Sequence, residues 1–145
     1  SPNSIVITNT DAEIEYVNDA FVRISGYPRE ELIGRNPRVL QSGLTPPETY
    51  RAMWAALGEG RTWQGEFINR RKNGEIYVEM AIFAPIRQAD GKVSHYLAIK
   101  EDITEKKRTS AELDDYRAHL EELVARRTAE LSEAKEAAEE AMLAK

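Results

Sequence analysis

From Thr104 to its end the sequence contains neither glycine nor proline, and this run leaves that part of the chain few possible structures. It is rich in Ala, Glu, Leu, Lys and Arg, the residues with the strongest preference for the α-helix. Apolar residues recur through it at intervals of three and four, namely Leu113, Tyr116, Leu120, Leu123 or Val124, Leu131, Ala134, Ala138 and Ala141. We therefore expect one long helix, which at ~1.5 Å per residue extends roughly 60 Å.

A single helix of this kind cannot bury its own apolar stripe, so the pattern predicts a partner helix in a coiled coil, and hence a homodimer. The spacing shifts at Leu123 and Val124, and Arg127 interrupts the stripe, which indicates a local change in the phase of the supercoil. Parallel and antiparallel pairing are both compatible with this spacing. The alternative is a solvated helical linker that has no partner.

The residues before Thr104 follow a different pattern, in which short apolar runs are separated by turns. "SIVITN" and "AEIEYVN" flank the turn sequence "NTDA" and predict a β-hairpin. "NDAFVRISGY" has apolar residues at helical spacing and predicts a helix that stops at Gly26. Thr45, followed by two prolines and Glu48, is typical of a capped helix start, and this helix should end near Gly58 or Gly60.

Three longer strand candidates follow, "TWQGEFINRRK", "EIYVEMAIFAPIRQ" and "KVSHYLAIKED". They are joined by "NG" and "DG", dipeptides that favour tight antiparallel hairpins. Because strands come first, helices next and strands again last, the pattern predicts an α+β fold with an antiparallel sheet and its helices on one face. We divide the chain into a globular body, residues 1–103, and a helical segment, residues 104–145.

Composition narrows the possible functions. The chain has 145 residues and a net charge of -5, which argues against nucleic acid as a partner. No stretch approaches the ~20 apolar residues of a membrane span, so we expect a cytoplasmic chain without membrane contact. The absence of cysteine excludes disulfides and thiolate metal sites. Because the sequence offers no nucleophile–base set, paired carboxylates or glycine-rich phosphate loop, we expect no catalytic residue, no metal site and no enzyme activity.

The motifs "NDAFVRISGY", "REELIGRNP", "GEFINRRKNGEIY" and the "DIT" of Asp102 to Thr104 resemble those of the PAS (sensory box) family, over the segment from Ser4 to Thr104. The resemblance implies a five-stranded antiparallel sheet in the order 2-1-5-4-3, whose concave face meets the helices around a pocket. The closing "RRTAELSEAKEAAEEAMLAK" resembles the linker before the phospho-accepting helix of sensor histidine kinases. This implies a kinase core of the parent chain as the downstream partner.

Family members that sense light through a flavin carry the pattern G-x-N-C-R-F-L-Q. The corresponding residues here are Gly34, Asn36, Pro37, Arg38, Val39, Leu40 and Gln41. Proline has no nucleophile, so no cysteinyl–flavin adduct can form at this position. By the resemblance, Asn36, Arg38 and Gln41 would meet the ribityl or phosphate groups of a flavin. The alternative is that they serve only helix and turn chemistry.

The same subclass places three amide side chains against the flavin ring, and these positions hold Asn69, Glu79 and Lys100 here. If they face inward, the period of two along a strand puts Trp63, Phe67, Tyr77, Phe83 and Ala98 on the same face. Glu79 and Lys100 lie on neighbouring antiparallel strands and can pair. The pair either closes an empty pocket or serves a polar ligand, with Glu79 accepting from a ring N–H and Lys100 donating to a carbonyl.

The chain also resembles the non-covalent FAD-binding PAS domains of bacterial redox and aerotaxis sensors, through Trp54, Trp63 and Asn69. In such a site Trp63 would pack near the ring and Asn69 would hydrogen-bond to it, whereas Trp54 is alternatively a core residue of its helix. Haem is disfavoured, because His119 lies on the long helix and His95 on the last strand, away from the pocket helix. FAD, a small polar metabolite and a pocket filled by side chains all stay open.

One face of the last strands is apolar, through Ile76, Val78, Met80, Ile82, Leu97 and Ile99. We expect a second protomer or a preceding helix to cover it. A change in the pocket would reach the long helix through Asp102, Ile103 and Thr104, with Thr104 as the helix cap. The predicted function is a dimeric sensory or relay module of a two-component sensor histidine kinase. The alternatives are an FAD-binding redox or oxygen-sensing domain and a ligand-free dimerisation module.

Overall fold

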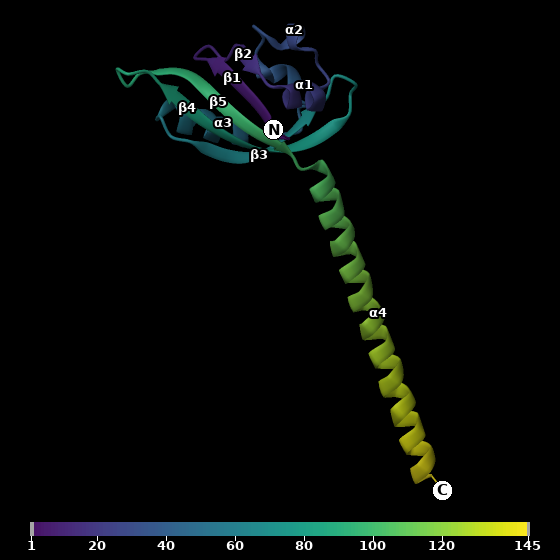
Figure 1. Ribbon diagram of the computed structural model, residues 1–145. Coiled ribbons are helices and arrows are strands. Elements are labelled where there is room, and N and C mark those ends of the chain that lie inside the picture. Colours follow the sequence, from purple (N-terminus) through teal and green to yellow (C-terminus); the bar gives the residue numbers. More distant parts are fainter. Residues whose placement is uncertain (1, 145) are drawn as a thin grey trace. The chain divides into compact units, whose positions relative to one another are not determined.

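The computed structural model describes residues 2–144, and its body is built on one antiparallel sheet of five strands in the order β2-β1-β5-β4-β3 (Figure 1). The strands are β1 (Ser4–Asn9), β2 (Ile14–Val17), β3 (Trp63–Arg70), β4 (Ile76–Arg87) and β5 (Val93–Asp102). The α+β class and the strand order expected from the resemblance are both confirmed.

The turns that join the three long strands form where the sequence predicted them. Gly74 and Gly91 take positive φ values of 92° and 84°, a backbone conformation that glycine adopts without steric cost. The side chains of Asn73 and Asp90 accept hydrogen bonds from the backbone N–H two residues later, at 2.9 Å in both turns. These short turns set the register that pairs Asn69 with Tyr77 and Phe83 with Ala98.

The first strand of the chain lies next to the last strand of the body. Strand β1 pairs with β2 on one side, where Val6 faces Val17, and with β5 on the other, where Val6 faces Ala98. Ser4 is the partner of Lys100 in this ladder. The two ends of the body therefore meet at the middle of the sheet.

Four helical segments connect β2 to β3, namely α1 (Asp19–Ser25), α2 (Arg29–Leu32), the 3-10 helix η1 (Pro37–Leu40) and α3 (Pro47–Gly58). The side chain of Asn18 caps α1 by accepting a hydrogen bond from the backbone N–H of Phe21 at 3.0 Å. Gly26 ends α1 in the left-handed conformation, at φ 77°. The stop predicted at this glycine is confirmed.

The cap predicted for α3 was wrong. Helix α3 begins at Pro47 behind Pro46, and no side chain of the described residues caps it. The hydroxyl of Thr45 instead accepts a hydrogen bond from the backbone N–H of Ile68 at 2.8 Å and donates to the carbonyl of Ile68 at 3.1 Å. The two prolines have no N–H, so the first turn presents fewer free donors and the hydroxyl is available to join α3 to β3.

The core consists of two groups of buried side chains on the helix-covered face of the sheet. The first contains Val6, Ile14, Val17, Phe21, Leu32, Leu40 and Ala98, and the second contains Met53, Leu57, Phe67 and Ala81. Phe83 packs against both groups. Burying one such large apolar side chain contributes about 1.5–3 kcal/mol. Strand β1 alternates between buried and half-buried residues, as expected when only one face of a strand meets a core.

The opposite face of β4 and β5 carries the apolar residues that the sequence placed there. Ile76, Ile82 and Ile99 are 38%, 44% and 38% exposed. The neighbouring Val78, Met80 and Leu97 are half-buried. Large apolar side chains are thus gathered on one face at moderate exposure.

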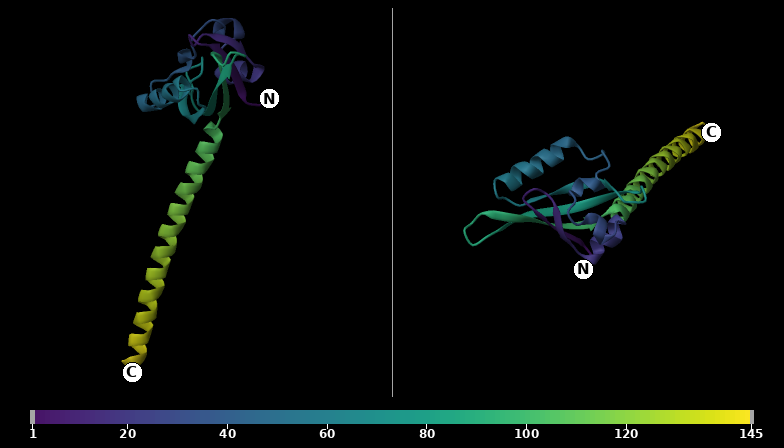
Figure 2. Two further views of the ribbon diagram at one scale, coloured as in Figure 1. Left: turned by 90° about the vertical axis from the view of Figure 1, so that its left-hand side faces the viewer. Right: turned by 90° about the horizontal axis from the view of Figure 1, so that it is seen from above.

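Contacts divide the chain into two units after Thr104. The second unit is helical, and the helix α4 runs from Thr104 to Leu143 without interruption (Figures 1 and 2). None of its described residues is buried, and Leu113, Leu120 and Leu131 are 47%, 39% and 71% exposed. The single long helix predicted from composition is confirmed. Within residues 2–144 no helix has the length and apolar character needed to cross a bilayer.

Candidate functional site

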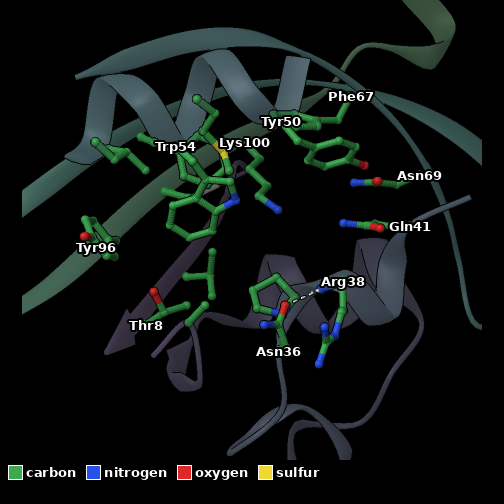
Figure 3. A pocket seen from close by; sticks show the side chains of 17 residues that line it. Thr8, Asn36, Arg38, Gln41, Tyr50, Trp54, Phe67, Asn69, Tyr96 and Lys100 are labelled. Atoms are coloured by element: carbon green, nitrogen blue, oxygen red, sulfur yellow. Dashed lines mark hydrogen bonds between the residues drawn. The ribbon is translucent and has the colours of Figure 1, made fainter. Parts of the chain in front are cut away.

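A cavity of about 240 Å³ lies in the body, among α3, η1 and the inner face of the sheet (Figure 3). Its lining consists of Val6, Thr8, Ala12, Asn36, Pro37, Arg38, Gln41, Tyr50, Met53, Trp54, Leu57, Phe67, Asn69, Phe83, Tyr96, Ala98 and Lys100. The volume lies below the ~300–1,000 Å³ typical of ligand pockets, whereas the mostly apolar lining with few polar groups is typical of them.

Aromatic side chains form much of the cavity wall. The rings of Tyr50 and Phe67 are 5.4 Å apart, and those of Trp54 and Tyr96 meet edge to face at 6.0 Å. Trp54 lines the cavity with 47% of its surface exposed, so the alternative in which it is a core residue is wrong. Rings arranged in this way suit a flat aromatic ligand.

Lys100, Asn69 and Glu79 come together at one end of the cavity, and each is at most 6% exposed. The amide nitrogen of Asn69 donates to Glu79 Oε2 at 2.9 Å. Lys100 Nζ lies 3.7 Å from the same oxygen, which is an ion pair but longer than a hydrogen bond. Lys100 and Asn69 line the cavity, while Glu79 lies behind them, so the carboxylate supports the other two side chains.

The residues around the missing thiol also reach the cavity. Pro37 lines it, together with Asn36, Arg38 and Gln41. Asn36 starts η1 by accepting a hydrogen bond from the backbone N–H of Arg38 at 2.9 Å, so part of the turn chemistry considered for it is present. Both charged residues of the lining, Arg38 and Lys100, are basic.

Trp63 does not line the cavity, although the resemblance placed it near the ring of a ligand. It packs instead against Phe67 at 5.5 Å and Phe83 at 6.2 Å between ring centroids. Its indole also covers Gly65, where an added Cβ would lie 2.2 Å from the ring. Trp63 therefore positions two aromatic side chains of the cavity wall and requires glycine beneath it.

Tyr77 lies beside the polar end of the cavity. Its hydroxyl is buried and forms no hydrogen bond within the described part of the chain. Burial raises the pKa of the Tyr77 phenol, and the negative charge of Glu79 raises it further, so the phenol stays neutral. The guanidinium of Arg71 lies over the ring of Tyr77, 4.3 Å from its centroid.

Arg71 connects this region to the end of β5. It donates to Asp102 Oδ2 at 2.7 Å and to the carbonyl of Ile24, at the end of α1, also at 2.7 Å. Burial acts to raise the pKa of the Asp102 carboxyl, but the hydrogen bonds from Thr104 and Arg71 and the charge of Arg71 outweigh it, and the pKa lies below its ordinary value. Arg71 has no local sequence signal for this role, because its partner Asp102 is 31 residues away along the chain.

Thr104 does not cap α4 in the way the sequence suggested, because it is the first residue of the helix. Asp102 accepts hydrogen bonds from both the backbone N–H and the hydroxyl of Thr104, the former at 3.0 Å. The Thr104 hydroxyl oxygen also accepts from the backbone N–H of Val78 at 3.0 Å, and the N–H of Ile103 donates to the carbonyl of Val78 at 2.8 Å. The three residues of the DIT motif are thereby fixed to β4.

The two histidines lie apart from the cavity lining. His95, on β5, has its Nε2 2.8 Å from Glu15 on β2, and His119 is exposed on α4. Within the described residues no group of three or more His, Asp or Glu side chains is placed to hold a metal ion.

Comparisons with known proteins agree with this architecture. The family model described as PAS domain matches residues 2–105. A nitrogen fixation regulatory protein of Klebsiella oxytoca is 39% identical over 101 residues, which are 70% of this chain and 20% of that protein. A blue-light-activated histidine kinase of Brucella canis is 31% identical over 119 residues, 80% of this chain and 24% of that protein.

Among solved structures, the LOV domain of the Erythrobacter litoralis EL346 blue-light activated histidine kinase superposes with a TM-score of 0.67 at 28% identity. The match covers 72% of this chain and 98% of that structure. The chain spans about a fifth to a quarter of the length of the two curated relatives it matches. The strand order, the cavity and these similarities together show that the chain belongs to the PAS domain family and that its body is a sensory input domain.

Proposed function

We propose that the body is a sensory module that holds a flavin, FAD, without a covalent bond, and that it controls a histidine kinase through a paired α4. Similarity to domains of a blue-light-activated kinase and of a regulatory protein supports the class of function. The flavin is supported by the aromatic wall of the cavity and by the buried ammonium of Lys100. The kinase as output is supported by the kinase relative and by the sequence of α4.

One observation carries the proposal of a ligand. Lys100 is 5% exposed, its ammonium points into an aromatic-walled cavity, and Nζ forms no hydrogen bond within the described part of the chain (Figure 3). A buried cation without hydrogen-bond acceptors is costly. A ligand with an acceptor at this end of the cavity would remove that cost. The carbonyl-bearing edge of a flavin ring has such acceptors, so the residues present fit the group.

Each side chain of the site has a role in this proposal. Lys100 would donate to a ring carbonyl, and Asn69, whose NH₂ group is already bound to Glu79, would offer its carbonyl oxygen to a ring N–H. Trp54 and Tyr50 would cover the ring. Asn36 and Arg38 would meet the ribityl and phosphate part, while Trp63 and Glu79 support the lining from behind. A bound flavin would supply absorption of blue light and a two-electron redox couple.

Proline at position 37 excludes a covalent adduct between this residue and the flavin ring. The side chain reaches the cavity lining but carries no group that can attack the ring. The ring is therefore held only by packing and hydrogen bonds. A redox or oxygen signal suits such a site better than a light-driven covalent switch.

The output would pass through Asp102, Ile103 and Thr104 into α4. Glu79, behind the cavity, is the strand partner of Asp102, and Asp102 is held by Arg71 and Thr104. A ligand that moves Glu79 or Asn69 thus acts close to the start of α4. Paired α4 helices and apolar contacts between the outer sheet faces of two protomers would turn this shift into a change in kinase activity.

An absorption spectrum of freshly purified protein tests the ligand. We expect flavin bands and, after denaturation, release of a molecule with the mass of FAD. Another released molecule, such as a small polar metabolite, would refute FAD but keep the sensory role. A colourless protein that releases nothing and binds no added FAD would favour the ligand-free dimerisation module.

A fusion of this chain to a histidine kinase core tests the output. Autophosphorylation should change between the oxidised and reduced states of the loaded fusion, and Asp102→Asn should weaken this difference while the body stays folded. Asp19→Asn is the matched control, because its carboxylate also pairs with an arginine but at 91% exposure. If the Asp102 variant responds as strongly as the control variant, the junction is not the route of the signal.

A further inference from the structure

This inference deepens the proposed function and rests on its ligand-binding cavity. We infer that Lys100 makes the cavity selective for the negatively charged form of a planar aromatic ligand. The same side chain would then determine which charge state of the ligand, and hence which signal, the domain favours.

The surroundings of the Lys100 ammonium leave room for an anion. Its only ion pair in the described part of the chain, with Glu79 at 3.7 Å, is longer than the ~2.7–2.9 Å of a charge-assisted hydrogen bond. The same oxygen of Glu79 already accepts a hydrogen bond from Asn69. The rings of Phe21 and Phe83 lie 5.6 and 5.8 Å from Nζ, and these cation–π contacts attract the ammonium but do not replace a hydrogen-bond acceptor. A lysine kept only for a structural ion pair would contact Glu79 more closely.

The charges around the cavity favour an anion over a cation. Among residues 2–144 the charged residues of the lining are Arg38 and Lys100, and none of the lining residues is acidic. In Figure 3 the ammonium of Lys100 points to the middle of the lining side chains, whereas the guanidinium of Arg38 points away from them. A ligand group at this end of the cavity therefore meets the ammonium first, with Glu79 behind it. Buried surroundings weaken solvent screening, so this single charge discriminates strongly.

For a flavin the inference has a specific form. Uptake of two electrons from a reductant such as dithionite, together with one proton from water, gives a neutral flavin ring one negative charge. Lys100 would stabilise that charged form relative to the neutral oxidised form, because only the charged form gains the attraction of the ammonium. The domain would then hold its ligand at a raised reduction potential.

A pair of probes that differ only in charge tests the inference without a flavin. 2-Naphthoate and 2-naphthamide have the same ring and nearly the same shape, but only the first is an anion. By calorimetry we expect the wild-type protein to bind 2-naphthoate about tenfold more tightly or better. Lys100→Met should abolish the preference. Lys92→Met is the matched control, because it removes one positive charge from an exposed turn, and it should keep the preference.

Two further variants guard against a misfolded protein. Lys100→Met leaves Glu79 buried without its cation, which is destabilising, so Lys100→Met/Glu79→Gln removes both charges and should fold while showing no preference. Glu79→Gln alone keeps the ammonium and removes the competing carboxylate, so it should increase the preference for 2-naphthoate. Circular dichroism and thermal unfolding establish that each variant is folded.

The second readout is the midpoint potential of protein loaded with FAD, measured during reduction by dithionite against a dye of known potential. Lys100→Met/Glu79→Gln should lower the potential relative to Glu79→Gln by about 30 mV or more, which is a tenfold change in the two-electron equilibrium. If FAD binds but neither readout depends on Lys100, this inference is wrong and the proposed function stands. If the wild-type protein binds neither FAD nor either naphthalene probe, both are wrong.

Discussion

Asp102 shows how one side chain can serve the body and the start of α4 at the same time. It accepts hydrogen bonds from Arg71 and from the N–H and hydroxyl of Thr104. Its side chain is 22% exposed and that of Arg71 17%, so water screens the pair less than it screens a surface ion pair. The ion pair between Arg29 and Asp19 is nearly as short, 2.8 Å, but its carboxylate is 91% exposed. The two pairs should therefore differ in their effect on stability.

Asp102→Asn should lower the free energy of unfolding by about 1.5–3 kcal/mol at neutral pH, since a hydrogen bond between charged groups is lost. Because folding lowers the pKa of Asp102, its contribution is present above the unfolded value of about 4 and disappears as the pH falls through the folded value. The wild-type and variant stabilities should converge in acid. Denaturant unfolding between pH 7 and pH 3 measures this, with Asp19→Asn as a control that shows little difference. If the difference in free energy of unfolding between wild type and Asp102→Asn stayed constant from pH 7 to pH 3, the pKa of Asp102 would not be lowered by folding.

Pro37→Cys should restore light-driven adduct formation in protein loaded with a flavin. The position lines the cavity, and the variant supplies the nucleophile that proline lacks. Blue light should bleach the flavin absorption of the variant almost completely, with recovery in the dark, and leave the wild type unchanged. Ala55→Cys, on the exposed side of α3, is the control thiol and should not respond. A loaded Pro37→Cys variant that does not bleach would mean that the ring lies elsewhere in the cavity.

At the scale of elements, the hydroxyl of Thr45 joins the segment before α3 to β3. Thr45 is 6% exposed and forms hydrogen bonds with both backbone groups of Ile68. Thr45→Val keeps the shape but leaves the N–H of Ile68 without its partner, while the carbonyl of Ile68 keeps a hydrogen bond from the Ser42 hydroxyl, so the free energy of unfolding should fall by about 1–3 kcal/mol. Thr45→Ser keeps the hydroxyl and should lose less. If Thr45→Val unfolds at the same denaturant concentration as the wild type, the hydrogen bonds to Ile68 do not stabilise this junction.

The elements themselves could be predicted because their signals are local. Glycine followed the last turn of α1 at Gly26, "NG" and "DG" marked the two turns, and a run without Gly or Pro gave α4. Thr45 and Thr104 both carried a helix-cap signal, yet their hydroxyls bond to Ile68 and Val78 on the sheet. Such partners are 23 and 26 residues away, so only the folded sheet decides between them and a local cap.

The candidate site was predictable in part for the same reason. The resemblance placed Asn69 and Lys100 at the pocket, and both line the cavity. Alternation along the strands then put Phe67, Phe83 and Ala98 on the same face, and these residues line it as well. It could not show that Glu79 lies behind the lining or that Trp63 turns over Gly65, because both depend on how neighbouring side chains fill space. The half-exposed position of Trp54 likewise follows from packing between α3 and Tyr96, which helical spacing alone does not specify.

At the scale of the whole molecule, pairing of two α4 helices would join two protomers into one dimeric sensor. Leu120→Asp replaces an apolar residue of the stripe by a charge and should weaken dimerisation about tenfold or more, since each copy loses a buried leucine. His119→Asp is the control on the neighbouring, exposed position. Sedimentation at a series of concentrations measures the dissociation constant. A wild-type chain that stays a monomer throughout the series would exclude the paired-helix output.

The pairing of Ser4 with Lys100 places the first strand of the body against its last. On the ribosome the hairpin of β1 and β2 emerges early, but one edge of β1 has no neighbour until residues 93–102 have been synthesised. The nascent sheet therefore carries an open edge for most of its synthesis, and contacts between such distant residues close slowly. The sheet can be completed only after β5 has been synthesised, so a chain interrupted before β5 would expose an unpaired, aggregation-prone strand rather than form a smaller working domain.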